Sequence, residues 1–137
     1  MKVFLSHAQN DKTLARQAEA ALTQAGLEVW SDDQILPGDN WAAKHAEALD
    51  NAEAMVVLLS AAALQSQEVM ADLSFALGQR GYKGRLVPVV TSPKDVQGSL
   101  EIPWILKRMD TVELGAFNHP EEAFSSVAQR LKASLDL

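Results

Sequence analysis

An uninterrupted apolar run near the middle of the chain, AMVVLLS at residues 54–60, constrains the fold more than any other feature. The run is much shorter than the roughly 20 apolar residues that a membrane-spanning helix needs. Runs of this kind are typical of a strand that is covered on both faces by helices. It therefore predicts the central strand of a parallel sheet.

Predicted strands and helices alternate on either side of this run. Short runs of β-branched and aromatic residues predict strands at 2–6, 27–30, 85–91 and, more weakly, 111–114. Apolar residues at helical spacing predict helices over 10–26, 41–52, 61–80 and 119–135. Asn10 or Asp11 is expected to cap the first helix, and Asp39 or Asn40 the second. Pro88 has no backbone N–H, which predicts that its strand lies at an edge or carries a local irregularity.

This alternation predicts one α/β domain over residues 1–137. Strand–helix–strand units give a parallel sheet with helices on both faces, because their crossovers are right-handed. Five such strands favour the flavodoxin-like order 2-1-3-4-5. The sequence contains no repeat, linker or low-complexity segment that would divide the chain.

Composition excludes several classes of function. The chain has 18 acidic and 12 scattered basic residues, a net charge of −6, so we expect no direct contact with nucleic acid. It has no cysteine, and its three histidines are not spaced as a metal set, so we expect no metal site. The amino-terminal residues turn polar too soon for a signal peptide, and no run spans a membrane. We therefore expect a cytoplasmic protein without membrane contact.

The carboxyl ends of the predicted strands collect the polar residues of the chain. Ligands bind at this edge of a parallel sheet, where the strand order reverses. Trp30 and Trp41 flank one of its loops, and aromatic rings beside acids and hydroxyls suit a purine or nicotinamide ring with its ribose. The polar residues expected there are Ser6, His7, Asn10, Asp11, Asp32, Asp33, Ser60, Ser66, Glu68 and Asp72.

Common nucleotide and hydrolase motifs are absent. The sequence has no GxGxxG or GxxxxGK[ST] loop for phosphates, and no GxSxG nucleophile elbow. A phospho-receiver domain needs an aspartate at the end of its third strand, where this chain has Ser60. These classes are therefore not supported.

Four motifs in order resemble a bacterial TIR (Toll/interleukin-1 receptor) domain over nearly the whole chain. The first strand ends Phe4-Leu5-Ser6-His7, and the second ends in Trp30, two residues before Asp32. The segment Leu36-Pro37-Gly38-Asp39-Asn40-Trp41 resembles the family's BB loop, and the third strand ends in LLS. The resemblance implies the TIR fold.

Many TIR domains cleave NAD⁺, so the resemblance implies an NAD⁺ glycohydrolase of bacterial defence or signalling, with NAD⁺ as substrate and no cofactor. The family's catalytic glutamate lies in the helix after the third strand, and its position here is occupied by Asp72. Glu68, one turn earlier, takes the place of a family tryptophan. The residues that would line the nucleotide site are Ser6, His7, Trp30, Asp32, Asp33, Trp41 and Ser66.

Both departures from the family pattern fall on the site itself. Aspartate keeps the negative charge that stabilises an oxocarbenium-like ribose, but it is one methylene shorter than glutamate. A misplacement of about 1 Å can cost roughly 100-fold in rate. Glu68 lies on the same helix face and offers longer reach. Three outcomes stay open: reduced activity, activity from the Glu68–Asp72 pair, or none. A solvated helix face is the alternative interpretation of the two acids.

A non-catalytic function is the second hypothesis. TIR domains act by self-assembly, and the BB loop usually contributes to the contacts. Here the loop residues Leu36, Pro37, Gly38 and Asp39 would make them, with other TIR domains as partners. A chain with a weakened catalytic site would then serve as a scaffold or adaptor.

Overall fold

The fold is a five-stranded parallel sheet with the strand order β2-β1-β3-β4-β5. The structure is a computed structural model, and it describes residues 1–31, 36–78, 82, 85–91 and 111–134. The order and the parallel pairing confirm the predicted flavodoxin-like arrangement. The expected site residues Asp32 and Asp33 lie outside the described part of the chain.

The strands form close to where the sequence predicts them. The central strand β3 is buried along its whole length, as its apolar run requires. The bounds are Lys2–Ser6 for β1, Glu28–Trp30 for β2, Ala54–Leu59 for β3, Leu86–Val90 for β4 and Val112–Glu113 for β5.

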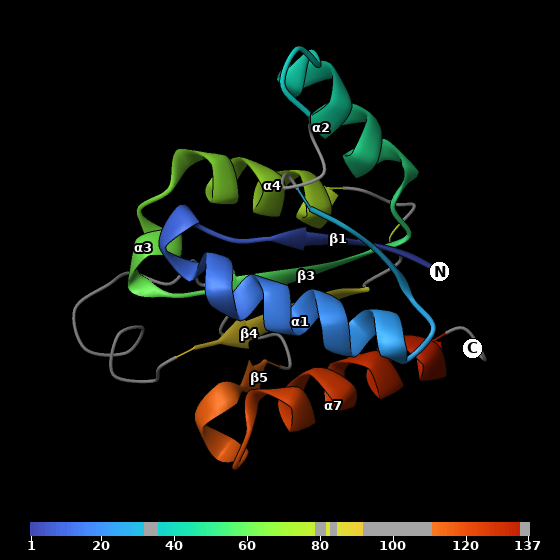
Figure 1. Ribbon diagram of the computed structural model, residues 1–137, viewed down its shortest axis with the longest axis vertical. Coiled ribbons are helices and arrows are strands. Elements are labelled where there is room, and N and C mark those ends of the chain that lie inside the picture. The colour runs from blue at the N-terminus through green and yellow to red at the C-terminus, as the bar shows by residue number, and fades with distance from the viewer. Residues whose placement is uncertain (32–35, 79–81, 83–84, 92–110, 135–137) are drawn as a thin grey trace.

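Helices cover both faces of the sheet (Figure 1). α1 and α7 lie side by side on one face, while α3 and α4 lie on the other. α2 stands apart from the other helices on that second side of the sheet. The bounds are Lys12–Gln24 for α1, Trp41–Asn51 for α2, Ala61–Leu64 for α3, Gln67–Gly78 for α4 and Pro120–Ala133 for α7. Short 3₁₀ turns, Gln9–Asp11 and Leu114–Ala116, precede α1 and α7.

Two apolar clusters, one on each face, hold the layers together. On the α1–α7 face, Leu22 and Phe124 pack against alternate residues of β1 and β3. On the opposite face, Leu73 and Tyr82 pack against the remaining residues of the same strands. Successive side chains of a strand point to opposite faces, so an all-apolar β3 serves both clusters.

The single helix predicted over 61–80 is wrong, because two helices occupy this segment. Ser60 caps α3, its hydroxyl accepting from Ala63 N, and the chain leaves the helix at Gln65. Ser66 then begins α4, its Oγ accepting from Val69 N at 3.2 Å. Two serines six positions apart therefore start two helices, since a serine side chain satisfies an otherwise unpaired N–H.

Pro88 lies in β4, which has neighbours on both sides. Met55 N donates to Arg85 O and Thr91 N donates to Leu59 O, so odd-numbered residues here bond to β3. Pro88 is an even-numbered residue, so its nitrogen points away from β3 and toward β5. β5 pairs only with Val89 and Val90, so no donor is missed at Pro88 within the described sheet.

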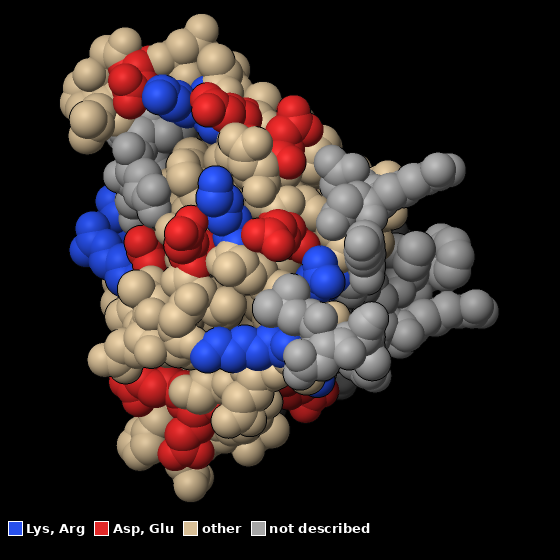
Figure 2. Space-filling view, turned by 90° about the vertical axis from the view of Figure 1, so that its right-hand side faces the viewer, with Lys and Arg blue, Asp and Glu red and all other residues tan. Residues whose placement is uncertain are grey.

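Charged side chains are interspersed on the face shown in Figure 2, where Lys and Arg alternate with Asp and Glu. Among the described residues of this face there is no gathering of basic side chains of the kind that a phosphate backbone requires. No helix in the described part of the chain has the length and apolar character to cross a membrane.

Candidate functional site

Asp72 lies at the meeting point of three elements. It belongs to α4, and its residue is only 5% exposed. Ser6, the last residue of β1, donates its hydroxyl to Asp72 Oδ2 at 2.9 Å. His45 of α2 places Nε2 2.7 Å from Asp72 Oδ1. An ionised carboxylate only accepts hydrogen bonds, so Nε2 of His45 carries the proton in this pair.

The sequence of α4 explains why this acid faces inward. Val69, Leu73 and Ala76 recur at helical spacing and pack against the sheet. Asp72 lies on the same side of the helix, and Glu68, one turn earlier, is exposed. The two acids therefore have different surroundings, although they are four residues apart.

His45 sits among aromatic rings. Its ring stacks on Trp41, one turn earlier in α2, with centroids 4.8 Å apart. The Phe4 and Trp30 rings form T-shaped pairs with it, with ring centroids 5.2 Å and 6.0 Å from that of His45. These two rings also stack on each other. The His45 ring is thereby fixed in position as well as hydrogen-bonded.

Tyr82 reports on the charge at this site. Its hydroxyl donates to Leu49 O of α2 at 2.7 Å. The pKa of Tyr82 is raised from 10.0 to about 12. Burial is the largest cause, and the negative charges of Asp72 and Asp50 add to it. The site therefore holds the phenol in its neutral, donating form.

One small cavity adjoins Asp72, and a wider hollow lies beside that cavity. A small cavity of about 60 Å³ is lined by Ser6, His7, Ser66, Glu68 and Asp72, among others. A wider, shallower hollow of about 450 Å³ shares Ser66 and Glu68 with it. The small cavity has room for about two water molecules, each taking about 30 Å³ of liquid. Asp72 thus lies behind a broad surface depression rather than in an open pocket.

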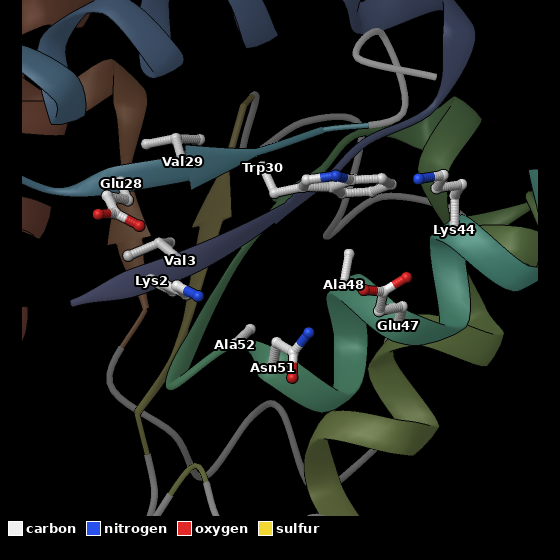
Figure 3. A pocket seen from close by; sticks show the side chains of 10 residues that line it. All are labelled: Lys2, Val3, Glu28, Val29, Trp30, Lys44, Glu47, Ala48, Asn51 and Ala52. Atoms are coloured by element: carbon white, nitrogen blue, oxygen red, sulfur yellow. The ribbon is translucent and has the colours of Figure 1, made fainter. Parts of the chain in front are cut away.

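A third cavity of about 300 Å³ lies away from the Asp72 carboxylate, between β1–β2 and α2 (Figure 3). Lys2, Glu28 and Trp30 line the strand side. Ala48 and Ala52 line the helix side, with Lys44, Glu47 and Asn51 around them.

The structure brings most of the expected site residues to one edge of the sheet, and it gives several of them local contacts. Ser6 contacts Asp72 directly, while Trp30 and Trp41 contact it only through His45. His7 lines the small cavity, and its Nδ1 lies 2.9 Å from Ala8 O. Asp11 lies at the N-cap position of α1, as expected, but its side chain accepts a hydrogen bond from Ser60 Oγ rather than from the helix.

The predicted BB loop contains a tight, exposed turn. Leu36 N donates to Asp39 Oδ2, and Asp39 N donates to Leu36 O. Gly38 has a φ of 93°, a conformation that residues with a side chain rarely adopt. Leu36 is 67% exposed at the start of this turn, so the loop presents an apolar side chain to solvent. Asn40 then caps α2, accepting from Ala43 N, as predicted.

Sequence reasoning missed His45 and Tyr82. The position of His45 on its helix is typical of a core-facing, structural residue, so sequence reasoning did not include it among the site residues. A signal existed for it, because Trp41, His45 and Leu49 recur every four residues and so share one face of α2. Nothing in the sequence pattern placed Tyr82 against α2.

No group of three or more His, Asp or Glu residues in the described part of the chain has a geometry that would hold a metal ion. The groups that bond to one another at the site are the Asp72 carboxylate, the His45 imidazole and the Ser6 hydroxyl.

A family model described as TIR domain matches residues 3–128. This chain belongs to the TIR domain family. The match covers every strand of the sheet and all residues of the Asp72 site. No curated protein sequence matches the chain.

Solved structures show the same fold around this TIR domain. The TIR domain of the Toll-related receptor TRR-2 from Hydra magnipapillata matches with a TM-score of 0.73 and 15% identity, over 95% of this chain and 97% of that one. The TIR domains of the activated Roq1 resistosome, which recognises the effector XopQ, match with a TM-score of 0.60 and 21% identity, over 93% and 83%.

A diflavin flavoprotein A3 from Nostoc sp. matches with a TM-score of 0.54 and 13% identity, over 96% of this chain and 94% of that one. A TIR domain and a flavoprotein thus share the flavodoxin-like sheet, so the sheet alone does not identify the ligand.

Proposed function

We propose that this TIR domain cleaves the bond between nicotinamide and ribose in NAD⁺, with Asp72 as the catalytic carboxylate. The observation that carries the proposal is the placement of Asp72. Its carboxylate lies at the ligand-binding edge of the sheet, on the wall of a cavity, and is oriented by Ser6. The TIR motifs add support, since the family position of the catalytic acid falls on this residue. By the same resemblance, the setting would be bacterial defence or signalling in the cytoplasm.

Cleavage of the nicotinamide–ribose bond requires little of the protein beyond a correctly positioned negative charge. When the glycosidic bond breaks, nicotinamide leaves with the bonding electron pair and the ribose carbon becomes cationic. A fixed carboxylate stabilises that charge without reorganising. Water then attacks the ribose carbon and loses a proton, which gives ADP-ribose. Ser6 limits the motion of Asp72 while this charge develops.

The wider hollow offers a place for the rest of the dinucleotide. It is lined by Asn10 and Gln67, and by Gln9, which it shares with the small cavity. Amide side chains of this kind both donate and accept hydrogen bonds, as ribose hydroxyls require. Glu68 lies between the two hollows, where it reaches a ribose hydroxyl more readily than Asp72 does.

The test is nicotinamide release from NAD⁺ by concentrated protein with a crowding agent. We expect release by the wild type, loss of release in Asp72→Ala, and equal or faster release in Asp72→Glu, which restores the longer acid. Glu47→Gln, which removes an exposed acid of α2, serves as the matched control and should match the wild type. Circular dichroism confirms that each variant is folded. Release that survives Asp72→Ala would refute the catalytic assignment.

A second function, assembly through the BB loop, is favoured by a separate observation. Leu36 is 67% and Trp41 is 42% exposed, and both flank the turn at Gly38. Exposed large apolar side chains of this kind mark protein contact sites. We infer that other TIR domains bind here, including further copies of this chain. If Asp72→Glu releases nicotinamide and the wild type does not, the result would favour assembly as the function of the natural sequence.

A further inference from the structure

α2 is held to the rest of the domain by few contacts. Leu49 is its one buried residue. Toward the C-terminal end of the helix, the Tyr82 hydroxyl donates to Leu49 O. Nearer the N-terminal end, His45 binds Asp72 of α4. The His45–Asp72 contact is thus the main polar attachment of the N-terminal half of the helix among the described residues.

There is open space beside the helix. The 300 Å³ cavity of Figure 3 separates α2 from β1 and β2. Ala48 and Ala52 face this cavity, and their small side chains leave it unfilled. Protein interiors are normally close-packed, so a helix next to such a space can shift without compressing a core.

The closed arrangement leaves no room for a substrate at Asp72. Both carboxylate oxygens already have partners, and the adjoining cavity measures about 60 Å³. Ligand pockets are usually about 300–1,000 Å³. His45 occupies one carboxylate oxygen of Asp72, and its withdrawal together with α2 would free that oxygen and give a nicotinamide riboside space beside it.

We propose that His45 is a gating residue: its contact with Asp72 holds α2 closed over the carboxylate, and opening of α2 exposes Asp72 to the dinucleotide. The identity of the substrate rests on the proposed function, but the closing of α2 by the His45–Asp72 contact does not. The helix pivots near Leu49, where Tyr82 retains its hold. A contact made only in the closed state lowers the apparent affinity for any ligand of the open state.

The gate is tested by hydrogen exchange of α2 relative to α7 in the same molecules. His45→Phe keeps a ring to stack on Trp41 but removes the N–H donor, whereas His45→Gln keeps a donor. We expect the exchange ratio to rise roughly tenfold in His45→Phe, as for the loss of a hydrogen bond to a charged group. His45→Gln should remain near the wild type. His119→Phe, at an exposed histidine before α7, is the matched control.

A second variant, Asp72→Ala, removes the other partner of the same contact. Asp72→Ala should raise the exchange ratio as His45→Phe does, and the double variant should rise no further, because both changes remove one interaction. An unchanged ratio in both single variants would overturn the gate. A general loss of stability would raise exchange in α7 as well and leave the ratio unchanged.

The cleavage assay separates the gate from the reaction. In an active enzyme, His45→Phe should lower KM for NAD⁺ roughly tenfold, by more than any change in kcat, since more molecules are open. An unchanged KM would contradict the gate. If no variant releases nicotinamide, the proposed function fails, while the exchange ratio still decides whether His45 holds α2.

Discussion

Tyr82 makes the charge at the candidate site measurable, because it is the only tyrosine in the chain. Burial and the charges of Asp72 and Asp50 raise its pKa from 10.0 to about 12. The unfolded chain loses the phenol proton near pH 10, and the folded chain keeps it to about pH 12. The stability that this proton contributes is therefore complete below about pH 10 and is lost as the pH rises to about 12.

We predict that Asp72→Asn lowers the pKa of Tyr82, because it removes the negative charge with the larger effect of the two named above as causes. The pKa should stay above 10, since burial is the larger cause and remains. Ultraviolet absorbance of the phenolate during an alkaline titration measures it directly. Glu47→Gln removes an exposed charge and should leave the midpoint where it is. An identical midpoint in Asp72→Asn would show that the phenol does not sense this carboxylate.

At the residue scale, the sequence predicted Asp72 and Ser6 as site residues but not His45. Asp72 was found through its position in a family motif. Ser6 was found because it ends the first strand, at the edge of the sheet where ligands bind. His45 is 27 positions from Asp72, and its contact depends on how α2 lies against α4. Helical spacing predicts which face of a helix points inward, but it does not predict which residue of another helix that face meets. The catalytic role of Asp72 stays a prediction.

At the scale of elements, Gly26 ends α1 with a motif that only a left-handed residue allows. Its φ is 96°, Leu27 N donates to Leu22 O, and Gly26 N donates to Thr23 O. This is the hydrogen-bond pattern of a Schellman motif. A Cβ at Gly26 would meet only the Lys132 side chain, at 3.7 Å, so no clash accompanies the backbone strain.

We predict that Gly26→Ala lowers the free energy of unfolding by about 1 kcal/mol, the usual cost of a left-handed alanine. Gly78→Ala is the matched control, because Gly78 ends α4 without a positive φ and has open space around it. It should be neutral or stabilising, by up to about 1 kcal/mol. Urea unfolding measures both. Equal destabilisation by the two changes would contradict the backbone explanation.

The elements were predictable where one signal dominates. The apolar run of β3 and the spacing of α1 and α7 left few alternatives, and these three formed close to the expected bounds. The segment 61–80 failed because Ala, Leu and Gln favour a helix throughout, while Ser66 offers a competing start. Pro88 predicted an edge strand or a local irregularity. The edge alternative is wrong, because β4 lies between β3 and β5, and the short β5 leaves no donor missing at Pro88 within the described sheet.

At the scale of the whole molecule, the exposed turn of the BB loop predicts a contact between copies. Leu36→Glu should weaken self-association roughly tenfold, because it replaces an apolar side chain whose burial is worth about 1.5–3 kcal/mol. Sedimentation velocity over a concentration series measures the change. Leu77→Glu is the matched control, since Leu77 is 40% exposed at the end of α4. An equal effect of both changes would argue against the BB loop as the contact.

The lengths of the strands bear on how copies of this chain can add to one another. β3, in the middle of the sheet, has six residues, whereas the outermost strands β2 and β5 have three and two. A short outer strand offers few backbone groups to an incoming strand, which is one way that proteins prevent uncontrolled pairing of sheets. The short outer strands therefore leave this domain little exposed sheet edge for amyloid-like pairing, even at high concentration.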